Sequence, residues 1–141
     1  MKILLAVDGS AYTKKMLAYL VTHDEVFTAL HNQFTLLTVR LPLPPRARAA
    51  IGKEIADGYH AHEVERVLAP VSKFLLRHGI DAKSAWKIGQ AGETIAAFAQ
   101  AGKFDLLLMG SHGYGALANL VMGSVATRVL AHCTVPVLLV R

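Results

Sequence analysis

The chain has 141 residues, of which 53% are hydrophobic and 18% are charged, so it has enough length for one core and too much apolar content for a disordered protein. No apolar run approaches the roughly 18 residues of a membrane span, and the single cysteine, Cys133, excludes an internal disulfide. We therefore expect one domain over residues 1–141, a cytoplasmic location and no membrane partner.

The first half of the chain predicts two strands and a helix. An apolar strand over residues 3–7 ends at Asp8, and this stretch is too short to be the apolar region of a signal peptide. A helical spacing of apolar residues follows over 16–21, and a second strand covers 34–39. Prolines between residues 42 and 45 predict an irregular loop that continues to about Ala56.

The second half predicts three more helices and three more strands. Apolar residues between 64 and 75 mark one face of a long helix, in which Pro70 is expected to cause a kink or a break near Arg66. The later strands are expected over 82–88, 105–109 and 137–140, and the later helices over 94–101 and 125–132. Five strands that alternate with four helices predict an α/β fold with an open parallel sheet and right-handed crossovers.

The glycine-rich segment after the fourth strand is the strongest functional signal in the chain. Gly110 and Gly113 follow the strand, and Gly123 and Ser124 precede the last helix. Glycine lets the backbone approach a phosphate and adopt positive φ, and a helix N-terminus offers unpaired N–H groups. These residues predict an anion site, in which the Ser124 hydroxyl either caps the helix or donates to a phosphate. The alternative is a plain glycine turn with Ser124 as the N-cap.

Two well-known phosphate motifs do not match this segment. The Walker A pattern fails because Ala116 and Leu117 stand where it needs Lys and Ser or Thr. The dinucleotide-binding pattern that begins at Gly113 lacks its acidic residue about 20 positions later, where Cys133 stands. No pair of carboxylates flanks the segment, so we do not expect an efficient hydrolase.

The net charge of +5 is concentrated in part around the proline loop, in Arg40 and in the basic residues between 46 and 53. This stretch is either a solvated loop or a surface that attracts anions. No aromatic residues interleave with these cations, so we expect no nucleic-acid partner. His60 and His62 are two apart on a helix and face different ways, which argues against a metal pair. His112, inside the glycine segment, is either a phosphate contact or a solvated residue.

Together these residues resemble the universal stress protein family over the whole chain. Residues 3–10 are similar to that family's first strand and turn, and residues 105–113 to its fourth strand and loop. Residues 122–126 and 135–140 are similar to its last loop and strand. The ATP-binding branch of the family carries G-x2-G-x9-G-(S/T), and all its spacings are met here by Gly110, Gly113, Gly123 and Ser124.

The resemblance implies a Rossmann-like fold of the adenine nucleotide alpha hydrolase-like type, with five parallel strands in the order 3-2-1-4-5. It implies that Asp8 lies near the ribose, that Val39 meets adenine through its backbone, and that Gly113 and residues 123–125 contact the phosphates. Thr38 and Tyr114 stand where members often carry His and Arg, and neither removes the backbone cradle. The expected binding residues are Ala6, Val7, Asp8, Val39, Met109, Gly110, His112, Gly113, Gly123, Ser124 and Val125.

The last strand is expected to pair two copies of the chain. It is short, apolar and placed at the end of the sequence, where a sheet edge exposes unpaired backbone groups. Pro136 suits the start of an edge strand because it has no N–H. The resemblance also implies a homodimer through this strand. Its residues are Val137, Leu138, Leu139 and Val140.

The function implied by the resemblance is that of an ATP-binding stress-response regulator. The ligand would be ATP, or alternatively ADP or AMP, with Mg²⁺ carried by the phosphates. Two other functions stay open at this point. One is a slow ATPase or another nucleotide-dependent enzyme, and the other is a dimerisation module that binds no nucleotide.

Overall fold

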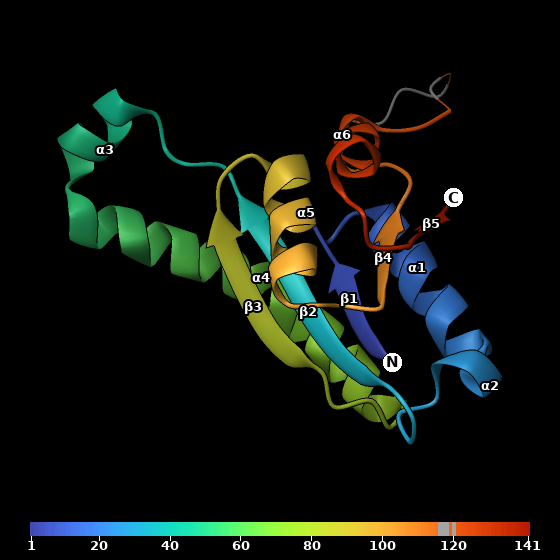
Figure 1. Cartoon of the computed structure of the whole chain (residues 1–141). Coiled ribbons are helices and arrows are strands. Elements are labelled where there is room, and N and C mark those ends of the chain that lie inside the picture. The colour runs from blue at the N-terminus through green and yellow to red at the C-terminus, as the bar shows by residue number, and fades with distance from the viewer. Residues whose placement is uncertain (116–118, 120) are drawn as a thin grey trace.

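The structure is a computed structural model that describes residues 1–115, 119 and 121–141, so Ala116 and Leu117 lie outside the described residues. Its centre is a five-stranded parallel sheet (Figure 1). The order β3-β2-β1-β4-β5 confirms the predicted order. The strands are β1 (Lys2–Ala6), β2 (Gln33–Arg40), β3 (Lys83–Ile88), β4 (Leu106–Gly110) and β5 (Val137–Val140).

Six helices occur among the described residues, so the predicted number of four was wrong. The two extra helices are short, and one of them buries no residue, so neither has a long apolar face that a sequence pattern could reveal. None of the described helices has the length and apolar content that crossing a bilayer requires. The helices are α1 (Ala11–Thr22), α2 (Asp24–Phe27), α3 (Pro45–Ile51), α4 (Lys53–Arg77), α5 (Ala91–Ala101) and α6 (Ser124–His132).

The irregular loop predicted to reach Ala56 ends at Pro44, and the alternative of a helix break near Arg66 was wrong. Helix α3 begins at Pro45, where a missing N–H is tolerated, and Gly52 at φ +80° turns the chain into α4. Helix α4 then continues through Pro70 to Arg77. Pro70 leaves the carbonyl of Arg66 without its helical donor, but both residues are exposed, so solvent can bond that carbonyl.

The sheet separates two apolar layers. Helices α1 and α4 cover one face, and α5 and α6 cover the other (Figure 1). Strand β1 shows the period of two: Leu5 packs toward α1 and α4, whereas Leu4 packs toward α5 and α6. Because β1 is buried on both faces, its carboxyl end is held firmly in the centre of the sheet. Helix α3 stands away from these layers.

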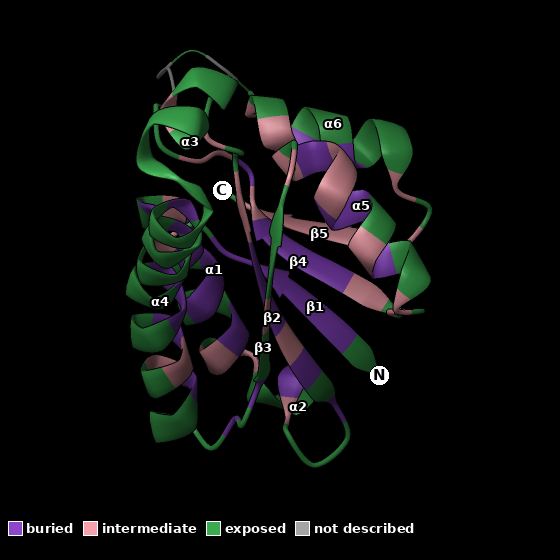
Figure 2. Ribbon diagram, turned by 90° about the vertical axis from the view of Figure 1, so that its left-hand side faces the viewer, coloured by how far each residue is buried: buried purple, intermediate pink, exposed green. Residues whose placement is uncertain are grey.

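The outer strands differ in exposure from the central ones. Figure 2 shows β1 and β4 mainly buried, β5 partly buried and β3 largely exposed. Strand β1 pairs with β2 on one side and β4 on the other, with Ala6 opposite Met109. The strand order therefore reverses between β1 and β4, and in open parallel sheets ligands bind outside the strand ends at such a point.

Candidate functional site

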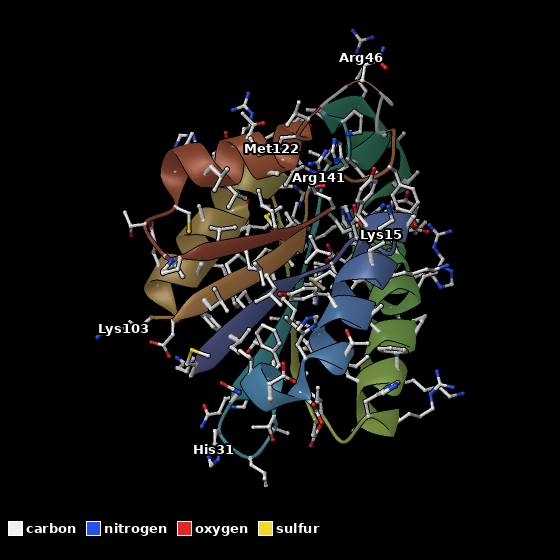
Figure 3. All side chains as sticks on the ribbon, turned by 90° about the vertical axis from the view of Figure 1, so that its right-hand side faces the viewer. Lys15, His31, Arg46, Lys103, Met122 and Arg141 are labelled. Carbon is white, nitrogen blue, oxygen red and sulfur yellow. The ribbon has the colours of Figure 1, made fainter. Side chains whose placement is uncertain are left out.

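A cleft of about 360 Å³ lies at the carboxyl edge of the sheet, where β1 and β4 end side by side. Its walls come from the ends of β1, β2 and β4, from the N-terminal parts of α1, α5 and α6, and from the loop after β4. Figure 3 shows Lys15, Met122 and Arg141 toward this end of the sheet, and His31 and Lys103 toward the other.

The cleft gathers all the residues that the sequence analysis put forward as ligand contacts. The fold brings all of these residues to one cavity. That each of them contacts a ligand stays a prediction. These lining residues are Ala6, Val7, Asp8, Val39, Met109, Gly110, His112, Gly113, Gly123, Ser124 and Val125. The other lining residues were not predicted as contacts: Thr13, Leu37, Ala91, Ile95, Tyr114, Gly115 and Ala126.

Asp8 is held by the start of helix α1. Its carboxylate Oδ1 accepts hydrogen bonds from the Ser10 N–H at 2.8 Å and from the Thr13 hydroxyl at 2.9 Å. The Asp8 N–H in turn donates to the Thr13 hydroxyl oxygen at 3.1 Å. Among the described residues, Oδ2 has no hydrogen-bond donor. The carboxylate is therefore fixed, with one acceptor oxygen left for a ligand.

Three glycines of the motif lie so close to neighbouring atoms that a Cβ would collide with them. A Cβ on Gly113 would lie 2.7 Å from Asp8 Oδ2, and one on Gly110 would lie 2.6 Å from the Cβ of Tyr12. A Cβ on Gly123 would lie 3.1 Å from the carbonyl oxygen of Ser111. None of these three glycines has positive φ.

The loop after β4 is closed at its base, which places the start of helix α6 against the cleft. The Gly123 N–H donates to the carbonyl of Ser111 at 2.7 Å, and the Ser111 N–H donates to the carbonyl of Val140 at 2.8 Å. Gly123 is the N-cap and Ser124 is the first helical residue, so the interpretation of Ser124 as the N-cap was wrong. Its exposed hydroxyl and the unpaired N–H groups of the first turn are thus available to an anion.

Few ionisable side chains line the described part of the cleft. They are Asp8, His112 and Tyr114, and no lysine or arginine is among them. The His112 ring packs 4.9 Å from the ring of Tyr12, and its Nδ1 lies 2.8 Å from the Ser111 hydroxyl. An anion in this part of the cleft would therefore depend on N–H groups, hydroxyls and the positive end of α6.

An ion pair outside the cleft links the two helices whose N-termini face it. Arg128 of α6 binds the carboxylate of Glu93 in the first turn of α5. The backbone N–H of Glu93 and the Arg128 guanidinium hold the pKa of the Glu93 carboxyl below its ordinary value. This pair supports the relative placement of α5 and α6 on one side of the cleft.

The two histidines of helix α4 lie in different environments. His60 is buried and His62 is exposed, so the two side chains do not face one another. Within the described ranges there is no group of three or more His, Cys, Asp or Glu residues that could hold a metal ion.

Comparison with known proteins relates this cleft to one family. The model of the universal stress protein family matches residues 1–141. A universal stress protein of Thermus aquaticus is 30% identical over 142 residues, which cover 99% of this chain and 97% of that protein. Universal stress protein Slr1230 of Synechocystis is 31% identical over 99% of this chain, and the chain spans 42% of the length of that relative.

Solved structures share the fold. Hypothetical protein MJ0577 has a TM-score of 0.77 at 26% identity, over 99% of this chain and 94% of its own. A universal stress protein family member from Arabidopsis thaliana with AMP bound has a TM-score of 0.69 at 18% identity, over 99% and 90% of the two chains. The universal stress protein from Archaeoglobus fulgidus in complex with dAMP has a TM-score of 0.67 at 17% identity, over 100% and 98%. At these last two identities the likeness shows the fold alone.

Proposed function

This chain belongs to the universal stress protein family, and on that premise we propose that it binds an adenine nucleotide in the cleft beyond β1 and β4. One observation carries the proposal: a single cleft brings together apolar strand ends, a fixed carboxylate and a helix N-terminus. These three features suit, respectively, a base, a sugar and a phosphate group. The nucleotides bound by the Arabidopsis and Archaeoglobus proteins support this ligand class.

The three parts of a nucleotide have distinct places in the proposed complex. Leu37, Val39 and Ile95 offer apolar surface for adenine. The backbone of Val39 would hydrogen-bond the edge of the base. Asp8 Oδ2 is an acceptor for the hydroxyls of ribose. The phosphates would lie over Gly113 and the first turn of α6, where N–H groups and the helix dipole favour negative charge.

Within the adenine nucleotides we propose ATP, with Mg²⁺ carried by its phosphates, and with ADP and AMP as alternatives. The described lining holds no lysine or arginine, so a cation that arrives with the nucleotide would offset part of the phosphate charge.

We further propose that the protein acts as a binding regulator of a stress response in the cytoplasm, with residues 1–141 as its single domain. Calorimetric titration with ATP, ADP and AMP, each with and without Mg²⁺, tests the binding. We expect saturable binding of at least one adenine nucleotide and none of the matching guanine nucleotide. A protein that binds no adenine nucleotide, or binds guanine nucleotides equally well, would overturn the proposal. A steady-state phosphate-release assay should show little or no turnover.

Replacing Ser124 by alanine is expected to weaken nucleotide binding and leave the fold stable. A hydrogen bond to a charged group is worth about 1.5–3 kcal/mol, which corresponds to a loss of affinity of about 10- to 150-fold. Because Gly123 is the N-cap, the hydroxyl of Ser124 does not cap α6. The melting temperature without ligand should therefore change little.

The matched control for Ser124→Ala is Thr127→Ala. The Thr127 hydroxyl donates to the carbonyl of Gly123 on the same helix and does not line the described cleft. Calorimetry should find normal affinity in Thr127→Ala and reduced affinity in Ser124→Ala. Equal ATP affinity in Ser124→Ala and the wild type would remove Ser124 from the phosphate site.

We also propose that β5 pairs two copies of the chain. The sheet order makes β3 and β5 the two edges. Strand β3 carries Lys83 and Lys87, which discourage edge pairing, whereas β5 consists of four partly buried apolar residues. The uncharged edge is the one on which another strand can add without bringing lysines into the contact.

A further inference from the structure

We propose that Thr13 is a positioning residue for sugar recognition, because it holds the Asp8 carboxylate in the orientation that a ribose hydroxyl meets. The inference rests on the proposed function, since it presumes a nucleotide in the cleft. It adds a residue to which neither the sequence motif nor the resemblance gives a role.

Thr13 is placed to act on Asp8 through two hydrogen bonds at once. Its hydroxyl donates to Asp8 Oδ1 at 2.9 Å and accepts from the Asp8 N–H at 3.1 Å. The side chain is only 3% exposed, and α1 holds it in place as the third residue after the N-cap Ser10. A hydroxyl has one proton to give, and here that proton is committed to the carboxylate.

The consequence for a ligand lies at the other carboxylate oxygen. Oδ1 is occupied by Ser10 and Thr13, so Oδ2 is the acceptor left over, and the absent side chain of Gly113 gives it room. With only the Ser10 N–H as an anchor, the carboxylate could rotate about its side-chain bonds away from Gly113. By holding the Asp8 carboxylate in place beforehand, Thr13 reduces the conformational entropy that would otherwise be lost when a ribose binds.

The arrangement also explains why the third helical position is a threonine rather than an acid. In a capping box, a Glu or Gln at this position accepts a hydrogen bond from the N–H of the N-cap residue. Here the N–H of Ser10 is taken by Asp8 Oδ1, so the carboxylate comes from the strand end and Thr13 supports it. One carboxylate thereby serves both the start of α1 and the cleft.

The test compares AMP with 2′,3′-dideoxyadenosine 5′-monophosphate, which lacks both ribose hydroxyls. Calorimetric affinities are measured for the wild type, for Thr13→Val, which removes the hydroxyl at nearly constant shape, and for Thr13→Ser, which retains it. We expect the wild type to prefer AMP and Thr13→Val to lose about tenfold in AMP affinity, with the dideoxy affinity nearly unchanged. Thr13→Ser should resemble the wild type.

Three results with the Thr13 variants would overturn this role for Thr13. They are an equal loss for both nucleotides in Thr13→Val, no loss for either, or a Thr13→Ser variant that behaves like Thr13→Val. A wild type that binds AMP without preferring it to the dideoxy compound also overturns it, and leaves nucleotide binding intact. If the wild type binds no adenine nucleotide, the proposed function itself is overturned.

A second measurement keeps the proposal testable if Thr13→Val does not fold. Asp8→Asn should narrow the preference for AMP over the dideoxy compound, and adding Thr13→Ala to it should narrow that preference little further. Because the two residues act through one hydrogen-bonded unit, their effects should not be additive when Asp8→Asn is combined with Thr13→Ala. Full additivity in that combination would show that Thr13 acts independently of Asp8.

Discussion

Replacing Gly113 by valine is expected to abolish nucleotide binding while the protein stays folded. The added Cβ would lie 2.7 Å from Asp8 Oδ2, closer than non-bonded atoms approach, and the branched side chain would fill space against the cleft. The carboxylate cannot give way cheaply, because Ser10 and Thr13 hold its other oxygen. Since Gly113 does not have positive φ, the effect is steric and not a strain on the backbone.

The measurement is the melting temperature with and without saturating ATP and Mg²⁺. A ligand that binds only the folded state raises the melting temperature, so the wild type should shift and Gly113→Val should not. Gly58→Val is the matched control, because Gly58 lies on α4 with open space around its Cβ position. It should shift like the wild type. Equal shifts in all three proteins would mean that the nucleotide binds elsewhere.

Replacing Leu138 by lysine is expected to convert a dimer into monomers. Leu138 is the second residue of the edge strand β5 and is partly buried against the layer formed by α1 and α4. In a pair of β5 strands the two new ammonium groups would lie at one seam, and like charges across an interface cost several kcal/mol. Light scattering at micromolar concentration should find a dimer for the wild type and a monomer for Leu138→Lys.

The control for this variant lies at the opposite edge. Trp86 of β3 is 41% exposed, so Trp86→Lys adds the same charge to the other edge strand and should leave the dimer intact. Thermal melting followed by circular dichroism distinguishes loss of pairing from loss of the fold, because a folded monomer of Leu138→Lys still melts cooperatively. A monomeric wild type, or a dimer broken only by Trp86→Lys, would contradict pairing through β5.

The sheet was predictable because its central strands are unambiguous. Residues 3–7 and 106–109 are apolar runs that end at turn residues, and β1 and β4 begin and end within one residue of the predicted strands 3–7 and 105–109. The order of the strands came from the resemblance, since periodicity does not say which strands are neighbours. The helix between Pro45 and Ile51 escaped prediction because none of its residues is buried.

The site was predictable where it lies on strand ends and in the glycine segment. Most of these residues lie at or directly after the ends of β1, β2 and β4, and the sheet order brings those ends to one edge. Thr13, Ala91 and Ile95 were missed because they lie outside the glycine motif, on helices whose approach to the cleft depends on how α1 and α5 pack. The sequence also could not show why residue 113 is a glycine. The reason is its contact with Asp8, which is 105 positions away in the chain.

The most direct test of nucleotide binding in this cleft is to identify what the protein holds. The wild type and Gly113→Val are each incubated with ATP and Mg²⁺, freed of unbound ligand and denatured, and the released small molecules are measured by mass spectrometry. We expect an adenine nucleotide, approaching one per chain, from the wild type and none from Gly113→Val. Release of no nucleotide from the wild type, or of equal amounts from both proteins, would contradict binding in this cleft.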